Sequence, residues 1–153
     1  MPPKEDRYFE DYAAGAVFEY EPFVVDEAEV LSFAKRYDPQ TMHVDPVAAG
    51  AGPFHGLIAS GWHTASMMMR PFVDHYLSSV ASLASPGVDE LRWNRPVRPG
   101  DRLTVRVTTT EARASKSKPD RGIIFTTIEA INQDGIAVCT MKAMTMMARR
   151  RQT

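Results

Sequence analysis

The chain has 153 residues, 44% of them hydrophobic and 24% charged, which suits one domain with a buried core. Its 18 basic and 19 acidic residues leave a net charge of −1, which excludes a general affinity for nucleic acid or anionic membranes. No secretory signal and no run of about 18 apolar residues occurs. Because the single Cys139 also rules out an intrachain disulfide, we expect a cytoplasmic protein without membrane insertion.

The first third of the chain predicts a strand, a short helix and a loop. Residues 17–25 alternate apolar and polar side chains, as a half-buried strand does. Asp26 can cap a helix that continues to residue 37, and Glu29 stands three positions later, as in a capping box. Residues 44–55 are rich in proline and glycine, which predicts a loop with about one helical turn.

A second, more apolar helix is expected from Trp62 to Val80, because apolar side chains recur there at steps of three and four. Methionines fill its other faces, so we expect the helix to be largely enclosed. Pro71 lacks the N–H that an interior helical residue donates, which predicts a kink or a break at that position.

The second half of the chain predicts four antiparallel strands. The segments rich in Val, Ile and Thr are 88–97, 101–113, 122–131 and 136–148. The turn signals PG, SKSKPDRG and NQDG separate them. A long helix followed by such strands is typical of an α+β domain in which a curved sheet packs around the helix. Because edge pairing covers the free edges of such a sheet, we expect a homodimer, with residues 1–14 and 148–153 flexible or peripheral.

Asp38 and His43 lie five residues apart in the sequence YDPQTMH, directly after the first predicted helix. Pro39 resists helix continuation, so the chain can bend there and bring the carboxylate and the imidazole together. In the alternative interpretation, Asp38 only caps a turn and His43 is an ordinary structural histidine.

Gly56, Ser60 and Gly61 precede the second helix in the sequence GLIASGWHT. Helix N-termini carry unpaired N–H groups and partial positive charge, and a glycine lets a ligand approach the backbone closely. These features suit an oxyanion hole. The alternative is that Ser60 is only the N-cap and Gly61 only relieves crowding. His55 and His63 lack the i, i+4 spacing of a helical metal pair, so no metal site is predicted.

The sequences FAKRYDPQTMHVDP and GPFHGLIASGWHTASMMM resemble the MaoC-like acyl dehydratases, relatives of the (R)-specific enoyl-CoA hydratases of the hotdog fold. The resemblance covers nearly the whole chain, through LRWNRPVRPGD and SKSKPDRG. In that family a D-x-N-P-x-H loop supplies a catalytic Asp and His, and a glycine at the start of the central helix donates its N–H to the thioester carbonyl. By position these roles fall on Asp38, His43 and Gly61. The chain departs from the family at Gln40-Thr41, which replace Asn-Pro, and at Met69, which replaces a serine.

The resemblance implies one hotdog domain over residues 1–153 that hydrates or dehydrates an α,β-unsaturated acyl thioester, with a CoA thioester as the default substrate. Asp38 and His43 would hold the water and exchange protons with the substrate, while Gly61 N–H would stabilise the enolate oxygen. No metal or redox cofactor is required. Two alternatives stay open: a hotdog thioesterase, in which water attacks the carbonyl carbon, and an acyl-CoA-binding subunit without turnover.

Candidate substrate contacts fall into two groups. Those near the expected centre are Gln40, which would brace the loop, and Gly56, Ser60, Trp62 and Met69. The phosphates of CoA favour basic side chains. The candidates for these phosphate contacts are Arg95, Arg98, Lys116, Lys118 and Arg121.

Overall fold

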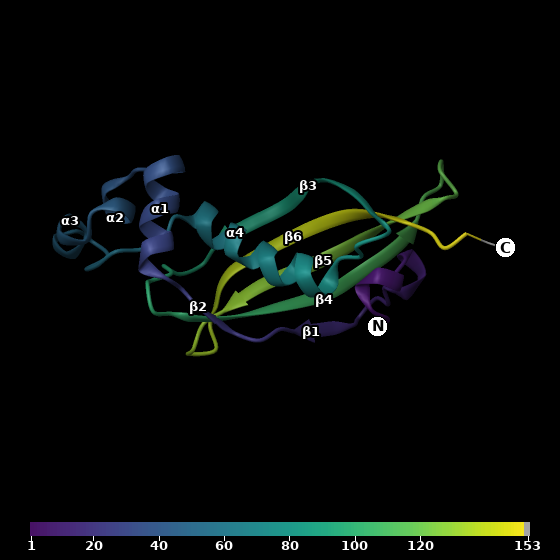
Figure 1. Cartoon of the computed structure of the whole chain (residues 1–153), viewed down its shortest axis with the longest axis horizontal. Helices are drawn as coiled ribbons and strands as arrows, with labels where there is room; N and C mark the ends of the chain where they lie inside the picture. Colours follow the sequence, from purple (N-terminus) through teal and green to yellow (C-terminus); the bar gives the residue numbers. More distant parts are fainter. Residues whose placement is uncertain (152–153) are drawn as a thin grey trace.

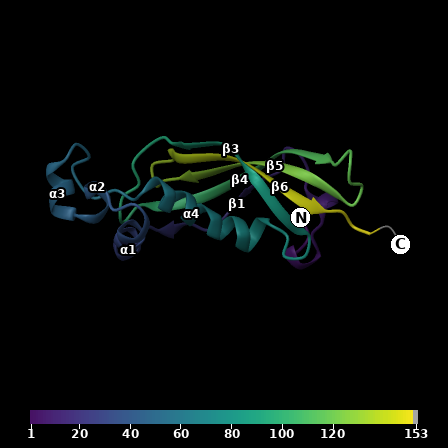
Figure 2. The same cartoon turned by 90° about the horizontal axis from the view of Figure 1, so that it is seen from above.

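The computed structural model describes residues 1–151. One antiparallel sheet carries a helix along one of its faces, and three short helices extend beyond one end of the sheet (Figures 1 and 2). This arrangement confirms the predicted α+β architecture with a central helix.

The described residues form a six-stranded sheet with the order β1-β4-β5-β6-β3, in which β2 also pairs with β4. The strands are β1 (Val17–Glu19), β2 (Phe23–Val24), β3 (Ser82–Trp93), β4 (Arg102–Ala114), β5 (Arg121–Ile131) and β6 (Ala137–Ala148). The strand expected over 17–25 is therefore split in two, and Pro22, which has no N–H for a ladder, lies in the gap. β3 pairs with β6, so the predicted turn at Pro99-Gly100 does not join neighbouring strands.

The core lies between the sheet and the helix. Along β4, Leu103, Val105 and Val107 are fully buried and alternate with more exposed residues, as predicted. Because successive side chains of a strand point to opposite faces, these three share the face that the helical layer covers. They join Met68 and Phe72 in one hydrophobic cluster.

The helices are α1 (Glu27–Tyr37), α2 (Thr41–Val44), α3 (Pro46–Ala51) and α4 (Gly61–Pro71), followed by the π-helical turn η3 (Phe72–Tyr76). α1 begins as predicted, because the Asp26 carboxylate accepts a hydrogen bond from the N–H of Glu29. The segment 44–55, expected to be a loop with about one helical turn, contains all of α3. Asp45 caps this helix, and Pro46 occupies its first turn, where a missing N–H costs nothing. We call α1, α2 and α3 the overhang (Figure 1).

The central helix changes type after the proline and is only half covered. Pro71 ends α4, and the next turn is π-helical, with the N–H of Leu77 donating to Phe72. The predicted break is thus confirmed. The expectation that this helix is largely enclosed is wrong for a single chain, because the sheet covers only one side of the helix. On the other side, the side chains of Trp62 and Met69 are 60% and 38% exposed.

The first residues of the chain, expected to be flexible or peripheral, pack against the domain. Arg7 and Tyr12 are both buried. The guanidinium group of Arg7 donates hydrogen bonds to the carbonyl oxygens of His75 and Tyr76, at the end of η3. Carbonyl groups at a helix C-terminus lack helical partners, and a basic side chain satisfies them well.

The described C-terminal residues are also tied down. Arg149 pairs with Glu10, and Arg150 pairs with Asp6 and Asp11. These ion pairs join the two ends of the chain. Of the tail that we expected to be flexible, Gln152 and Thr153 lie outside the described residues.

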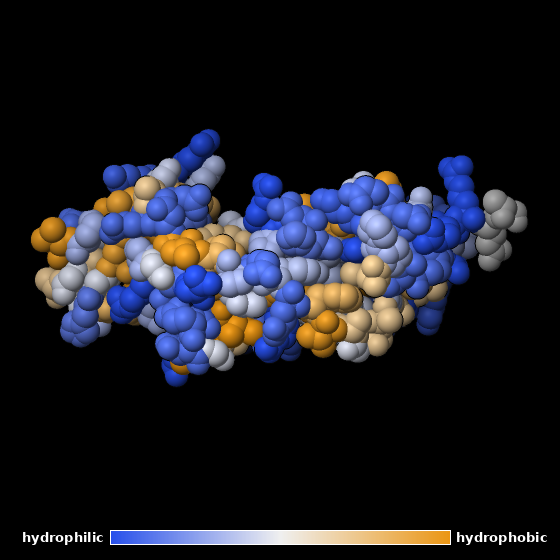
Figure 3. Space-filling view, turned by 60° about the horizontal axis from the view of Figure 1, so that its bottom comes forward, coloured by the Kyte–Doolittle hydropathy of each residue, from blue (hydrophilic) through white to orange (hydrophobic). Residues whose placement is uncertain are grey.

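β3 is an edge strand that stays open to solvent. Every residue from Ser82 to Asp89 is exposed, and the large apolar side chains of Leu83 and Val88 are among them. The face seen from the side of β1 and β2 is different, because hydrophilic side chains cover most of it (Figure 3). Among the described residues, no helix has the length and apolar character needed to cross a bilayer.

Candidate active site

Asp38 and His43 are brought together by the end of one helix and the start of another. Asp38 caps the C-terminus of α1, where its N–H donates to Ala34, and His43 lies on α2. Only Asp38, Pro39 and Gln40 separate the two helices. The chain therefore bends where the sequence predicted, and Asp38 Oδ2 lies 3.5 Å from His43 Nε2.

His43 is buried and its ring has a defined orientation. Its Nδ1 atom lies 2.8 Å from the carbonyl oxygen of Ile58. A carbonyl oxygen only accepts hydrogen bonds, so Nδ1 carries the hydrogen. In the neutral imidazole, Nε2 then has a free lone pair that points toward Asp38.

Two side chains fix the carboxylate of Asp38. The Gln40 amide donates to Oδ1 at 2.7 Å, and the Ser60 hydroxyl donates to Oδ2 at 2.7 Å. These hydrogen bonds, that from Gln40 first, hold the pKa of Asp38 below its usual value. Gln40 and Ser60, both candidates for substrate contact, thus hold the Asp38 carboxylate from two sides.

When Asp38 is ionised and the His43 imidazole is in its neutral form, the two facing groups are both hydrogen-bond acceptors. The carboxylate then has no hydrogen to donate, and the imidazole carries its hydrogen on the far nitrogen. They therefore do not satisfy each other directly at 3.5 Å. A molecule with two O–H donors, such as water, suits this position because it can donate one hydrogen to each group.

The start of α4 adds unpaired backbone donors to the site. Ser60 is the N-cap residue, but its hydroxyl makes no capping bond and is directed to Asp38 instead. Within the described residues, the N–H of Gly61 has no hydrogen-bond partner. The helix N-terminus thus leaves N–H groups and partial positive charge available to an oxyanion.

Trp93 covers one side of Gly61. Its indole N–H donates to the Gly61 carbonyl oxygen at 2.7 Å, and a Cβ atom at position 61 would overlap the indole ring. Close packing against Trp93 thus explains the glycine. A tryptophan at the end of a distant strand carries no local sequence signal for this contact.

A cavity of about 250 Å³ opens beside His43 and Gly61. Thr64, Phe54 and Trp93 form part of its wall, and Arg95 is its only basic residue besides the histidine. The sequence did not single out Thr64 or Phe54. Both look like ordinary core residues, and only the fold places them here.

The other expected contacts lie farther from this cavity. Gly56 has a φ of +154°, and the Arg98 guanidinium next to it donates to the carbonyl oxygen of Phe54, which is a structural contact. Trp62 and Met69 lie on the exposed side of α4. The remaining basic candidates, Lys116, Lys118 and Arg121, belong to the β4–β5 connection and the start of β5, at the end of the molecule opposite the overhang (Figure 1).

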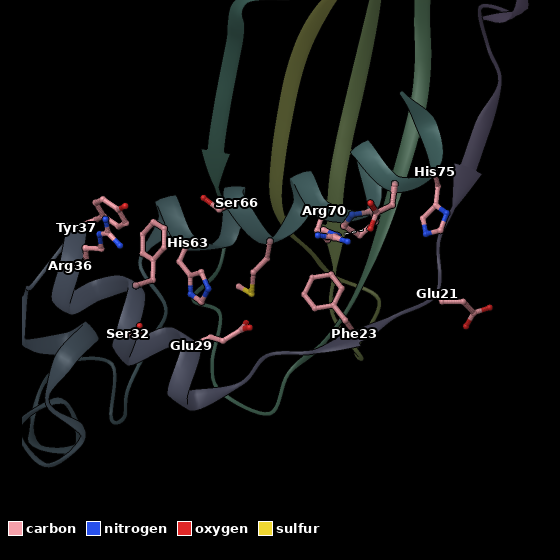
Figure 4. A pocket seen from close by; sticks show the side chains of 14 residues that line it. Glu21, Phe23, Glu29, Ser32, Arg36, Tyr37, His63, Ser66, Arg70 and His75 are labelled. Atoms are coloured by element: carbon pink, nitrogen blue, oxygen red, sulfur yellow. Dashed lines mark hydrogen bonds and ion pairs between the residues drawn. The ribbon is translucent and has the colours of Figure 1, made fainter. Parts of the chain in front are cut away.

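A larger hollow of about 780 Å³ lies between α1, α4 and the chain near β2 (Figure 4). Phe33, His63 and Met67 line it, whereas Asp38, His43 and Gly61 do not. His63 stacks on Phe33 with 4.8 Å between ring centroids, and burial lowers its pKa. Within the described residues, no group of three or more His, Cys, Asp or Glu side chains could hold a metal ion.

An antiparallel sheet packed along one central helix is the architecture of a hotdog-fold domain, and here an acid and a histidine lie beyond the N-terminus of that helix. Residues 11–129 match the model of the MaoC like domain. The chain therefore belongs to the MaoC-like family, as its motifs indicated.

Solved structures and curated relatives agree with this assignment. A MaoC-like dehydratase from Rhodospirillum rubrum is 38% identical, with a TM-score of 0.87 over 95% of this chain and 99% of that one. An (R)-hydratase from A. caviae involved in PHA biosynthesis is 25% identical, with a TM-score of 0.72 over 87% and 95%. The 3-hydroxyacyl-thioester dehydratase Z of Mycobacterium tuberculosis is 36% identical over 52% of this chain and 54% of its own length.

Proposed function

We propose that the protein catalyses the reversible hydration of an α,β-unsaturated acyl thioester, with a CoA thioester as the substrate. The observation that carries the proposal is the pair of facing acceptors, Asp38 Oδ2 and His43 Nε2, 3.5 Å apart beside a helix N-terminus. Water addition needs a held water, a proton acceptor and a donor to the enolate oxygen. The site offers groups for all three.

In the proposed reaction, the water oxygen attacks the β carbon while His43 Nε2 accepts one of its protons. His43 is the better acceptor of the two, because the hydrogen bonds from Gln40 and Ser60 lower the pKa of Asp38. Asp38 accepts the second O–H of the water and stabilises the imidazolium that forms. His43 then returns its proton to the α carbon, which gives the 3-hydroxyacyl thioester; dehydration is the same path reversed.

Gly61 N–H holds the thioester oxygen during this reaction. As the C=C electrons move toward the carbonyl, negative charge develops on that oxygen, and a preorganised N–H with the dipole of α4 stabilises it. One such donor typically contributes about 3 kcal/mol to the transition state. The proposed steps use no cofactor. Arg95, at the cavity, is our candidate for a CoA phosphate contact.

The test is loss of the conjugated-thioester absorbance of crotonyl-CoA, measured beside an assay for free thiol. The variants are Asp38→Asn and His43→Gln, with His75→Gln as the control because His75 is exposed and lies outside the cavity. We expect absorbance loss without thiol release in the wild type and the control. Each site variant should lose at least about a hundredfold in kcat/KM.

Thiol release would instead assign the chain to the thioesterases. Binding of crotonyl-CoA with neither signal would identify an acyl-thioester-binding protein without turnover. Full activity in either site variant would refute the proposed roles of Asp38 and His43, the catalytic dyad.

We also propose that the chain forms a homodimer through β3. This strand has one unpaired edge and is exposed on both faces, so a second β3 can extend the sheet. The exposed Val88, with Trp62 and Val73 of the helical layer, would add apolar contact. Light scattering should give the mass of a dimer, and Val88→Lys should shift it toward the monomer. A monomeric wild type at micromolar concentration would refute the proposal.

A further inference from the structure

The geometry points to a short, apolar acyl group as the substrate of this site. This inference rests on the proposed function, because it assumes that the thioester oxygen lies at Gly61 N–H. Two hollows flank α4, and they predict different substrates. The smaller one contains His43 and Gly61, and the larger one contains neither.

The smaller cavity favours a short acyl chain by its size. Its volume of about 250 Å³ is roughly a third of the 780 Å³ of the larger hollow. A long acyl chain would therefore fit the larger hollow better than the space beside His43 and Gly61.

The wall of the cavity allows no extension toward the core. Thr64 lies on the buried side of α4, and one turn further Met68 is completely buried in the hydrophobic cluster. Interiors of this kind are close-packed, so a longer chain would have to displace core side chains. The sheet side of α4 therefore ends the acyl site.

The lining of the cavity indicates the character of the acyl group. Ile58, Ala59 and Val97 are apolar and buried, and no carboxylate lines this space. Arg95 is exposed, which places the basic group where the phosphate-bearing part of CoA would leave the cavity. The buried end has no partner for a charged or strongly polar acyl terminus, which would be costly to desolvate.

The test is a series of trans-2-enoyl-CoA substrates with four, six, eight, ten and twelve carbons. We expect kcat/KM for the two shortest to exceed that for the two longest at least about tenfold, since a misfitting methylene costs about that much discrimination. Ala59→Leu should fill the cavity and lower kcat/KM for six carbons at least tenfold relative to four. Met67→Trp, the matched control, fills the larger hollow and should leave the profile unchanged.

Thermal melts check that each variant is folded. Comparable kcat/KM for four and twelve carbons would overturn the inference. So would a Met67→Trp variant that loses only the long substrates, because the acyl chain would then occupy the larger hollow.

Calorimetry with the unreactive butanoyl-CoA and decanoyl-CoA separates the size of the site from turnover. Tighter binding of butanoyl-CoA supports a short site even if no enoyl-CoA is hydrated, in which case only the proposed reaction fails. Tighter binding of decanoyl-CoA overturns the short site whether or not hydration occurs.

Discussion

Replacing Ser60 by alanine should separate the positioning of Asp38 from its chemistry. The Ser60 side chain is fully buried, and its hydroxyl donates to Asp38 Oδ2, the same oxygen that faces His43. Alanine removes this donor and leaves the rest of the dyad in place. Because the hydroxyl does not cap α4, the substitution removes no capping bond from the helix.

The expected loss follows from the hydrogen bond. A bond to a charged group contributes about 1.5–3 kcal/mol, and each 1.36 kcal/mol of barrier changes the rate about tenfold. If the transition state uses the whole bond, kcat/KM for crotonyl-CoA should fall by about 10- to 100-fold. The effect should appear mainly in kcat, since Ser60 holds Asp38 rather than the substrate.

A direct titration of Asp38 distinguishes this positioning from a merely structural effect. The Ser60 bond lowers the pKa of Asp38, so the pKa of this carboxyl, followed by NMR, should rise in Ser60→Ala. Ser60→Thr keeps the hydroxyl and should restore the wild-type pKa of Asp38. An alanine variant with wild-type rate and an unchanged pKa of Asp38 would show that the bond does not position Asp38.

Three other substitutions probe different parts of the structure. Gly61→Ala should lower both the melting temperature and the rate of hydration, because a Cβ atom at position 61 would overlap the Trp93 indole ring. The double variant Gly61→Ala/Trp93→Ala should therefore be as active as Trp93→Ala alone. Arg7→Met should cost about 1–3 kcal/mol in urea unfolding, since it leaves the His75 carbonyl without its side-chain donor and the Tyr76 carbonyl with only the Tyr12 hydroxyl. Arg92→Met at the surface should change the unfolding free energy by less than about 0.5 kcal/mol. Burial lowers the pKa of His63, so its contribution to stability is full above the unfolded value of roughly 6.5 and is lost as the pH falls from there through the folded pKa. His63→Phe should therefore flatten the decline in unfolding free energy between about pH 7 and 5, and an unchanged slope would contradict this assignment.

Sequence periodicity predicted the regular elements best where one face of an element is buried. β4 and β5 alternate because each has one face against the helix, and the pattern is visible in their residues. β3 was predicted to start at residue 88 but begins at Ser82. Its first half is exposed on both faces and contains Pro86 and Gly87, so only its irregular pairing with β6 makes it a strand.

In the candidate site, too, the sequence predicted the local features and missed a long-range contact. A proline after an acidic residue was enough to predict the bend that brings Asp38 to His43, because that bend is local. The contact between Ser60 and Asp38 spans 22 positions, and a serine before a helix normally acts as its cap. The sequence therefore predicted where Ser60 lies but gave no sign that its hydroxyl leaves the helix uncapped.

Ser60, whose hydroxyl does not cap α4, belongs to a short segment, residues 58–61, that contacts several parts of the site. The backbone of Ile58 donates to Met42 and accepts from His43, while the next N–H, of Ala59, donates to Val97 near the sheet. The same short segment then supplies the Ser60 hydroxyl to Asp38 and begins α4. This segment thus positions the imidazole through a backbone carbonyl, the carboxylate through the Ser60 hydroxyl and the unpaired N–H of Gly61 through its own backbone, with Gln40 as a second donor to Asp38. If the proposed function holds, the water and the thioester oxygen are aligned by groups already fixed before the substrate binds, which loses little entropy on binding and suits a reaction that depends on geometry.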